Sequence, residues 1–218
     1  MAQQRGLRER KKLEQRQRLA DIAAALFADR GYDVVSMSDV ARAADVSDQT
    51  VYNYFPAKPD LVLDRAEEFR ERSGRVVRDR APGATPASVV RGLVQEDIER
   101  FRAADVRLAR GEFPALCVSS AALKRSALEF RARQVETVAA AISDTTAGLP
   151  VLVSHAHAAA LVSIVQAVTD RIGTCVLDGD TSDAAADAMD RDARAAFDDL
   201  DRRFTDLAAG PDPQGAPA

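Results

Sequence analysis

Hydroxyl, amide and phenol side chains are concentrated in one short stretch of the sequence, Ser47 to Tyr54 (SDQTVYNY). If this stretch is a helix, Val51 and Phe55 share an inward face at a spacing of four residues, and most of the polar side chains face outward. Such hydroxyl and amide groups donate to phosphate oxygens and to base edges, so the pattern favours contact with double-stranded DNA. The alternative is an ordinary helical hairpin, which gives no reason to expose Tyr52 and Tyr54.

Two helix starts would position this polar stretch. Ser36 can cap a first helix, and Asp39, three residues later, can return the hydrogen bond in a capping box. Residues 44–46 are the predicted turn, and Ser47 then caps a second helix that ends near Tyr54. Two short helices at a steep angle, the second with a polar outer face, indicate a helix-turn-helix.

The stretch from Gly31 to Leu61 (GYDVVSMSDVARAADVSDQTVYNYFPAKPDL) resembles the signature of the TetR family of bacterial transcriptional regulators. The matching residues are Gly31, Tyr32, Val40, Ala41, Ala44, Val46, Ser47, Thr50, Tyr52, Tyr54, Phe55, Lys58 and Leu61. Asp45 stands where the family usually has a turn glycine; because Asp tolerates the left-handed conformation, we expect the fold to be kept. Gln49 stands where the family often has another glycine, so its relatives do not define the base preference.

The resemblance implies a homodimeric, ligand-responsive transcriptional regulator, most often a repressor, that binds a palindromic operator. The alternative is a helical dimer that binds a small molecule or a protein and has no specific DNA binding. Asp45 and Asp48 give this alternative some weight, because carboxylates close to phosphates are unfavourable.

The expected DNA contacts fall into two groups. The phosphate anchors, besides the amides at the two helix starts, are Ser36, Ser47, Thr50, Tyr52 and Lys58. The candidates for base edges are Ser38, Gln49, Asn53 and Tyr54, and Asp48 either accepts from cytosine or merely favours the helix dipole.

Composition limits the remaining possibilities. The 218 residues are 46% hydrophobic and 29% charged, with 5% aromatics and no Trp, which favours helices over sheets. Only two cysteines, Cys117 and Cys175, argue against a disulfide framework. The first residues form no apolar leader, and polar residues interrupt the apolar run 151–168. We therefore expect a soluble cytoplasmic protein without a membrane span.

Charge is distributed unevenly along the chain. The net charge is −4, yet residues 1–20 carry seven Lys and Arg against two Glu, a local charge of +5. Attraction to phosphates depends on the local patch, because screening limits it to about 10 Å at moderate salt. Two interpretations of the basic N-terminal arm, residues 1–12, remain open. The arm contacts phosphates or a minor groove, or it is a solvated terminus.

The apolar periodicity predicts an all-α fold of about nine helices and no strand. The expected helices are 7–30, the two of the helix-turn-helix, 60–80, 85–104, 107–116, 119–144, 151–177 and 182–207. We interpret residues 1–59 as a DNA-binding domain, 60–208 as a ligand-binding and dimerisation domain, and 209–218 as a disordered tail.

Two of these helices suggest a dimer interface. The helix 151–177 is apolar nearly all round and needs cover on every side, while 182–207 has one apolar stripe and an acidic outer face. They resemble the helix pair that builds the four-helix dimer interface in the TetR family. A dimer also suits DNA binding, because two recognition helices read the two halves of a palindrome.

Catalytic and metal chemistry finds little support in the sequence. His155 and His157 are two residues apart, so a helix sends them to different sides, and no further ligands lie at a usable spacing. The sequence contains no glycine-rich phosphate loop, GxSxG elbow or HExxH motif. We therefore expect neither an enzyme, nor a cofactor, nor a metal.

The remaining helices could enclose an apolar cavity for a small-molecule effector, as in relatives. Polar groups that could orient such a ligand are Gln134, His155, His157 and Gln166, and Phe101 and Phe113 are possible walls.

Overall fold

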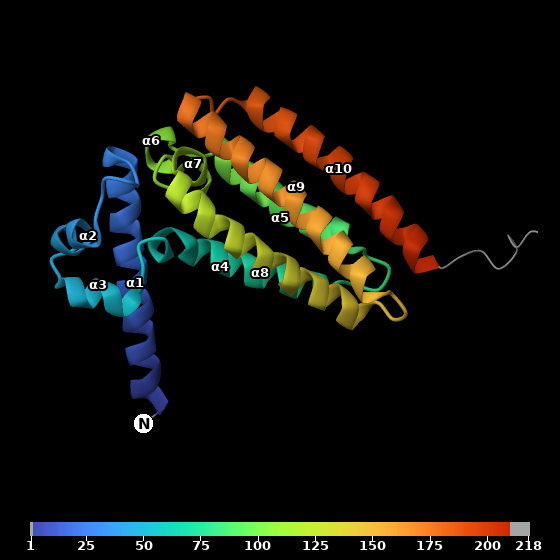
Figure 1. The fold of residues 1–218 in the computed structure, drawn as a ribbon, viewed down its shortest axis with the longest axis horizontal. Coiled ribbons are helices and arrows are strands. Elements are labelled where there is room, and N and C mark those ends of the chain that lie inside the picture. Colours follow the sequence, from blue (N-terminus) through green and yellow to red (C-terminus); the bar gives the residue numbers. More distant parts are fainter. Residues whose placement is uncertain (1, 210–218) are drawn as a thin grey trace, which may run out of the picture.

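The computed structural model describes residues 2–209, except for the side chains of residues 2–8, 65, 208 and 209 (Figure 1). This range consists of helices and turns without a strand, so the all-α fold expected from the sequence is confirmed. The helices are α1 (Ala2–Arg30), α2 (Met37–Ala43), α3 (Asp48–Tyr54), α4 (Asp60–Arg78), α5 (Pro86–Arg102), α6 (Val106–Ala109), α7 (Phe113–Ser119), α8 (Ala121–Thr145), α9 (Val151–Asp178) and α10 (Asp183–Ala209).

Two expectations concern the ends of the chain. The helix α1 begins at Ala2 rather than near residue 7, but the side chains of the basic arm up to residue 8 lie outside the described residues. The expected disordered tail also lies outside them, apart from Ala209, which ends α10.

The helices α1, α2 and α3 form a head at one end of the molecule (Figure 1). The helix α1 has an apolar stripe at helical spacing, and its residues Leu19, Ala23 and Phe27 are buried in the core of the head. Val51 and Phe55, the predicted inward residues of the recognition unit, are fully buried in the same core. Burial of this single face fixes α3 on the head and leaves its polar side free.

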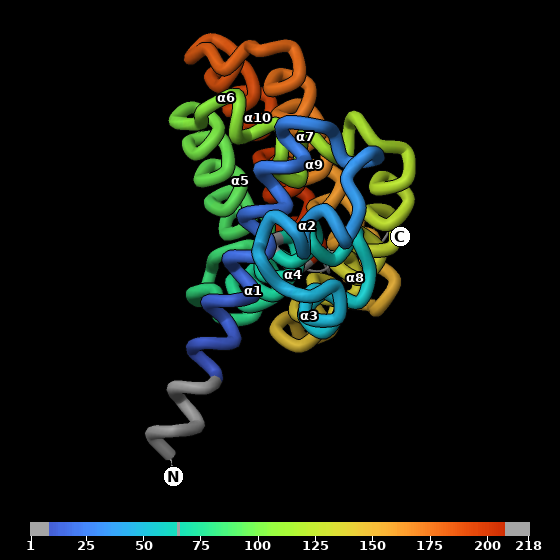
Figure 2. The backbone as a smooth tube through the Cα atoms, turned by 90° about the vertical axis from the view of Figure 1, so that its left-hand side faces the viewer, coloured from blue at the N-terminus to red at the C-terminus, as the bar shows by residue number. Residues whose placement is uncertain are grey.

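The core of the head extends beyond the first sixty residues. Leu116 and Cys117 of α7 and Leu123 and Ala127 of α8 are buried in the same cluster as the helix-turn-helix. Figures 1 and 2 accordingly show the end of α1 next to α6 and α7. The head is therefore packed directly onto the body and is not joined to it by α4 alone.

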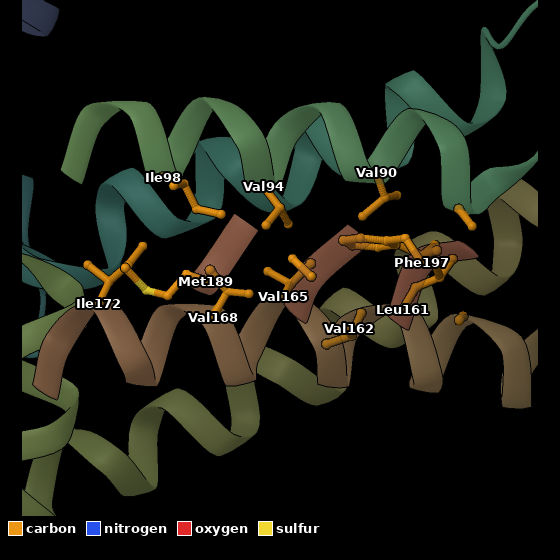
Figure 3. Packing of buried hydrophobic residues seen from close by; sticks show 14 of the residues in the cluster. Val90, Val94, Ile98, Leu161, Val162, Val165, Val168, Ile172, Met189 and Phe197 are labelled. Atoms are coloured by element: carbon orange, nitrogen blue, oxygen red, sulfur yellow. The ribbon is translucent and has the colours of Figure 1, made fainter. Parts of the chain in front are cut away.

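The body is a bundle of α4, α5, α8, α9 and α10, with α6 and α7 at the end that faces the head (Figure 1). In its centre α5, α9 and α10 meet, where Val94, Val165 and Met189 point toward one another (Figure 3). These buried side chains follow helical spacing on each helix, which is why the apolar periodicity located the helices.

The expected helix 107–116, with interruptions at Gly111 and Pro114, is divided into two short helices in the structure. The helix α6 ends at Ala109, and α7 begins at Phe113 with Pro114 in its first turn. Proline is favoured in the first turn of a helix, where its missing amide donor has no intrahelical partner. Pro114 therefore starts a new helix rather than interrupting an old one.

One large apolar residue of α8 faces solvent. Leu128 is 54% exposed, although an apolar residue of this helix would be expected on its inward side. The buried face of α8 runs through Leu123, Ala127, Phe130 and Gln134 at spacings of three and four residues. Leu128 follows Ala127 directly and is rotated about 100° away from that face.

The helix α9 is long and apolar enough to cross a membrane by length and composition, which holds for no other helix in the described range. In this fold it lies against α5, α7, α8 and α10, and Leu161 and Val165 belong to the core of the body. Its outer side remains exposed at Leu152 and Ala156. The single chain thus covers α9 only in part, as the apolar pattern predicted.

Candidate nucleic-acid interface and ligand cavity

The capping box predicted at the start of α2 is confirmed. The amide of Asp39 donates to Ser36 Oγ at 3.1 Å, and the amide of Ser36 donates to Asp39 Oδ2 at 2.9 Å. The Ser36 hydroxyl donates to the same carboxylate at 2.6 Å, and these hydrogen bonds lower the pKa of Asp39. The Ser36 hydroxyl thus keeps α2 in place and retains a lone pair for a further contact.

The turn and the cap of α3 also follow the prediction. Asp45 adopts a φ of 53°, the left-handed conformation for which the family signature has a glycine. The amide of Thr50 donates to Ser47 Oγ at 3.2 Å, and the two hydroxyls lie 2.8 Å apart. Ser47 and Thr50 therefore present their oxygens together at the start of α3.

The outer face of α3 carries two ordered polar pairs. Gln49 Nε2 donates to Asn53 Oδ1 at 3.0 Å, so the two amides lie side by side along the helix. Ser38 Oγ of α2 donates to the carboxylate of Asp48 and joins the two helices. The Asp48 carboxylate is thus partly satisfied within the head, which reduces its cost near a phosphate.

Tyr52, Lys58 and Tyr54, the predicted DNA contacts with the largest side chains, differ in how accessible they are. Tyr52 is 47% exposed, and within the described residues its hydroxyl has no hydrogen-bond partner. Lys58 Nζ lies 4.3 Å from the centroid of the Tyr32 ring, and burial lowers the pKa of this lysine. Tyr54 is half-buried against the core of the head, so it has the least freedom to reach a base.

Two arginines of α1 hold the helix-turn-helix at its carbonyl ends. Arg18 Nη2 donates to the carbonyl oxygen of Ala44 at the end of α2, at 3.0 Å. Arg16 Nη1 donates to the carbonyl oxygen of Tyr54 at the end of α3, at 2.5 Å. Positive charge is favourable at a helix C-terminus, where the last carbonyls lack partners. The sequence interpretation had counted both arginines only as part of a basic segment.

A cavity of about 360 Å³ lies in the body near the head, between α4, α5, the α6–α7 segment, α8 and α9. Four of the six predicted ligand residues line it: Phe101, Phe113, Gln134 and Gln166. The lining also includes Phe69 of α4 and Phe130 of α8, which the sequence interpretation did not select for this role. Their apolar helical spacing indicated burial but gave no indication of an unfilled space.

The two predicted histidines lie away from this cavity. His155 is exposed, and its Nδ1 lies 3.8 Å from a carboxylate oxygen of Glu136. His157 is buried against Phe204, with 4.8 Å between the ring centroids. The cavity begins eight residues further along α9, at Val165, about 12 Å away at the helical rise. Both histidines therefore fall outside the candidate ligand site.

The described residues contain no group of three or more His, Cys, Asp or Glu side chains that could hold a metal ion. Cys117 and Cys175 are both buried and free, and burial raises the pKa of the Cys117 thiol to about 12. Neither observation adds a reactive group to the head or the cavity.

A helix-turn-helix head with a polar recognition helix, packed on a helical body with a partly open cavity, defines a two-part helix-turn-helix protein. Residues 19–64 match the model of the family described as "Bacterial regulatory proteins, tetR family". The head therefore matches the DNA-binding region of the TetR family, which agrees with the resemblance of its sequence signature.

Among curated proteins, the chain is similar to the "HTH-type transcriptional repressor KstR" of Mycobacterium tuberculosis. The two are 38% identical over 74 residues, which cover 34% of this chain and 34% of that protein. The chain thus spans about a third of the length of the curated relatives it matches.

Among solved structures, the fold is similar to that of the regulator FadR from Bacillus subtilis in complex with stearoyl-CoA. The TM-score is 0.54 and the identity 17%, with 85% of this chain and 97% of that chain covered. A SmeT–triclosan complex gives a TM-score of 0.57 at 16% identity, with 94% and 100% covered. These similarities show that the head and the body together have the fold of those proteins.

Proposed function

We propose that the protein is a transcriptional regulator, a ligand-responsive repressor that binds a palindromic operator as a homodimer. The observation that carries this proposal is the ordered polar face of α3, which the buried residues Val51 and Phe55 turn outward. The match of the head to the family and its similarity to a curated repressor support the same function. In domain terms, residues 1–59 would bind DNA and residues 60–208 would bind the ligand and dimerise.

The DNA contacts follow from the geometry of the head. We assign phosphate contacts to Ser36, Ser47 and Thr50 at the starts of α2 and α3, to Tyr52 further along α3, and to Lys58 shortly before α4. We assign base contacts first to the amide pair Gln49 and Asn53, because amides can pair with adenine in the major groove. Ser38, Asp48 and Tyr54 have secondary roles, since each is already engaged within the head.

The dimer is proposed to form through α9 and α10. The outer side of α9 exposes Leu152, Ala156 and Ala167, and small side chains allow a second helix to approach closely. The apolar side of α10 is occupied by α5 and α9 of the same chain, so its remaining surface would contribute the rim. A symmetric dimer of this kind presents two copies of α3 to the two halves of an operator.

A physical connection links the cavity to the head. Phe113 lines the cavity and also packs on the core of the head. Gly111, just before α7, lies against the backbone of α1, and Ser120, just after it, donates to Asp33 Oδ1 at 2.7 Å. A ligand that favours one position of this segment would therefore shift the population of DNA-binding heads. The similar FadR and SmeT structures are complexes with small molecules, which supports a small-molecule ligand for this chain as well.

Selection of binding sites from random duplex DNA, followed by anisotropy titrations at several salt concentrations, tests this proposal. We expect a palindromic site whose affinity falls steeply with salt, because each neutralised phosphate releases counterions. Weak binding that all sequences share would instead favour the alternative, a helical dimer that binds a small molecule or a protein through the same body. The exposed Asp45 in the turn is the feature of the head that favours this alternative.

No described feature points to catalysis, and we propose a regulator without enzymatic activity or cofactor. We also propose a cytoplasmic location, where an operator would be accessible, with α9 as a core and interface helix.

A further inference from the structure

The wall of the body cavity is largely apolar and aromatic. Phe69, Phe101, Phe113 and Phe130 reach it from α4, α5, α7 and α8, and Val165 and Ile172 reach it from α9. Ligand cavities of proteins typically measure about 300–1,000 Å³, so about 360 Å³ suits a compact ligand. Removal of apolar surface from water is the main source of affinity that such a wall offers.

One polar side chain in this wall lacks a protein partner. Gln134 of α8 is only 4% exposed and lines the cavity, and within the described residues its amide makes no hydrogen bond. Because the oxygen and nitrogen of this amide face the cavity without a protein partner, they are available to a molecule that can bond to them.

The neighbouring polar side chains of the wall are already engaged. Thr169 Oγ1 donates to the carbonyl oxygen of Val165 at 2.9 Å, and Gln166 Nε2 donates to the carboxylate of Asp170. Glu112 also has an interaction within the chain. Gln134 is thus the lining side chain whose hydrogen-bonding capacity is best available to a ligand.

Charge in the lining argues against an ionic ligand. Among the described side chains of the lining, Arg100 is the one basic residue, and its guanidinium pairs with the carboxylate of Asp97. An anionic ligand would therefore meet no unpaired cation among these side chains, and its desolvation would not be compensated there. A cationic ligand would likewise find the Asp97 carboxylate already paired.

We propose that the cavity takes an uncharged, largely apolar small molecule with one hydrogen-bonding group, and that Gln134 binds this group. The inference rests on the proposed function in one respect, because such a molecule would be the effector of the regulator. Binding itself depends only on the body, so the two ideas can be tested separately.

The uncharged fluorophore N-phenyl-1-naphthylamine, which brightens in apolar surroundings, serves as the reporter for the full-length protein. Ala104 lines the cavity just after α5, whereas its neighbour Ala103 is exposed and outside the lining. We expect Ala104→Trp to fill the space and weaken binding of the reporter at least about tenfold, and Ala103→Trp to leave it unchanged. Equal binding by both variants would overturn the location.

Displacement of the reporter by four naphthalene probes tests the chemical class. We expect 2-naphthol to bind at least about tenfold more tightly than 2-naphthoate or 2-naphthylmethylammonium, because only the charged probes must be buried as ions. A charged probe that binds as tightly as 2-naphthol would overturn the assignment.

Gln134→Leu, which keeps a similar volume, tests the hydrogen bond. We expect this variant to lower the affinity for 2-naphthol about five- to tenfold. Its affinity for naphthalene, which has no polar group, should stay within about twofold of the wild-type value. Equal losses for the two probes would remove Gln134 from the site. An unchanged unfolding midpoint in denaturant titration serves as the folding control.

The operator titration distinguishes the two proposals. The protein could bind the probes with the expected preference and show no specific DNA binding. This result would support the ligand class and contradict the proposed function. Specific DNA binding without any reporter binding retains the regulator and overturns the ligand class.

Discussion

Arg16 of α1 binds Asp64 of α4 through two nitrogens, with Nε at 2.9 Å and Nη2 at 2.7 Å from the same carboxylate oxygen, Oδ1. The third nitrogen of the guanidinium donates to the carbonyl oxygen of Tyr54, and the group lies 4.4 Å from the centroid of the Phe55 ring. One side chain therefore connects the first helix, the end of the recognition helix and the helix that leads into the body.

Replacement of Arg16 by Met should destabilise this junction. Because the tyrosine carbonyl and the carboxylate lose their donor, we expect the free energy of unfolding to fall by about 1–3 kcal/mol. Denaturant titration followed by circular dichroism measures this change. The control is Arg10→Met on the same helix: Arg10 and its partner Glu14 are both mainly exposed, so the change should stay within about 0.5 kcal/mol. Equal losses in both variants would contradict the bridging role.

Lys58→Met should weaken DNA binding uniformly. Methionine can still cover the Tyr32 ring, but the variant lacks the charge that we assign to a phosphate. Anisotropy at several salt concentrations should therefore show a slope of log affinity against log salt that is smaller by about one. Tyr52→Phe, which removes only an exposed hydroxyl, should reduce affinity for all sequences and leave the slope unchanged. Unchanged binding in both variants would contradict the placement of the DNA-binding face.

Gly111→Ala should disrupt the contact between the head and the body. A Cβ atom at this position would lie 1.9 Å from the carbonyl oxygen of Ala24, so the backbone must move, and we expect a loss of more than about 1 kcal/mol. Gly92→Ala in α5 is the matched control, because a Cβ atom there meets nothing within 4 Å. That control should gain about 0.5–1 kcal/mol from its better helix propensity. Effects of the same sign in the two variants would rule out the close approach.

His157 should make stability depend on pH. Burial lowers the pKa of this histidine below 6.5, and Asp201 opposes the shift only in part. As pH falls below about 6.5, the unfolded chain takes up the proton first, so stability decreases toward the lower pKa of the folded protein. We expect His157→Phe to flatten this slope in unfolding titrations at mildly acidic pH. The exposed His155→Gln should leave it unchanged, and a slope that persists in His157→Phe would assign the effect to another group.

Ala156→Glu should weaken the proposed dimer. The residue lies on the exposed outer side of α9, and two introduced carboxylates would be desolvated and close to each other across a symmetric interface. Sedimentation equilibrium should show a dimer dissociation constant at least about tenfold higher than that of the wild type. Ala122→Glu, an exposed change on α8, is the control and should leave the dimer intact.

The head could be predicted from the sequence in detail because its signals are local. The cap at Ser36 with Asp39, the left-handed Asp45 and the inward pair of Val51 and Phe55 depend on neighbours within a few residues. The cap and the inward pair follow from residue types and spacing along the chain, whereas the turn at Asp45 was expected from the resemblance to the family signature.

The missed features depend on contacts between distant segments. The sequence showed Arg16 as a positive charge, and only the fold brings it to a carbonyl 38 residues away. Between α6 and α7, Gly111 packs closely against the backbone of α1, and periodicity does not report such a contact. His155 and His157 were placed on the correct helix, but their distance along it from the cavity required the packing of α8 and α9.

The core of the head is completed by Leu116, Cys117, Leu123 and Ala127, which follow it in the chain by more than fifty residues. A fragment that ends at residue 59 would expose the apolar surface that these side chains cover. Exchange of DNA-binding heads between relatives would therefore require the matching stretch of α7 and α8 to be transferred with the head. Evolution of a new operator specificity is then constrained where α7 and α8 pack on the head, while the exposed face of α3 remains free to change.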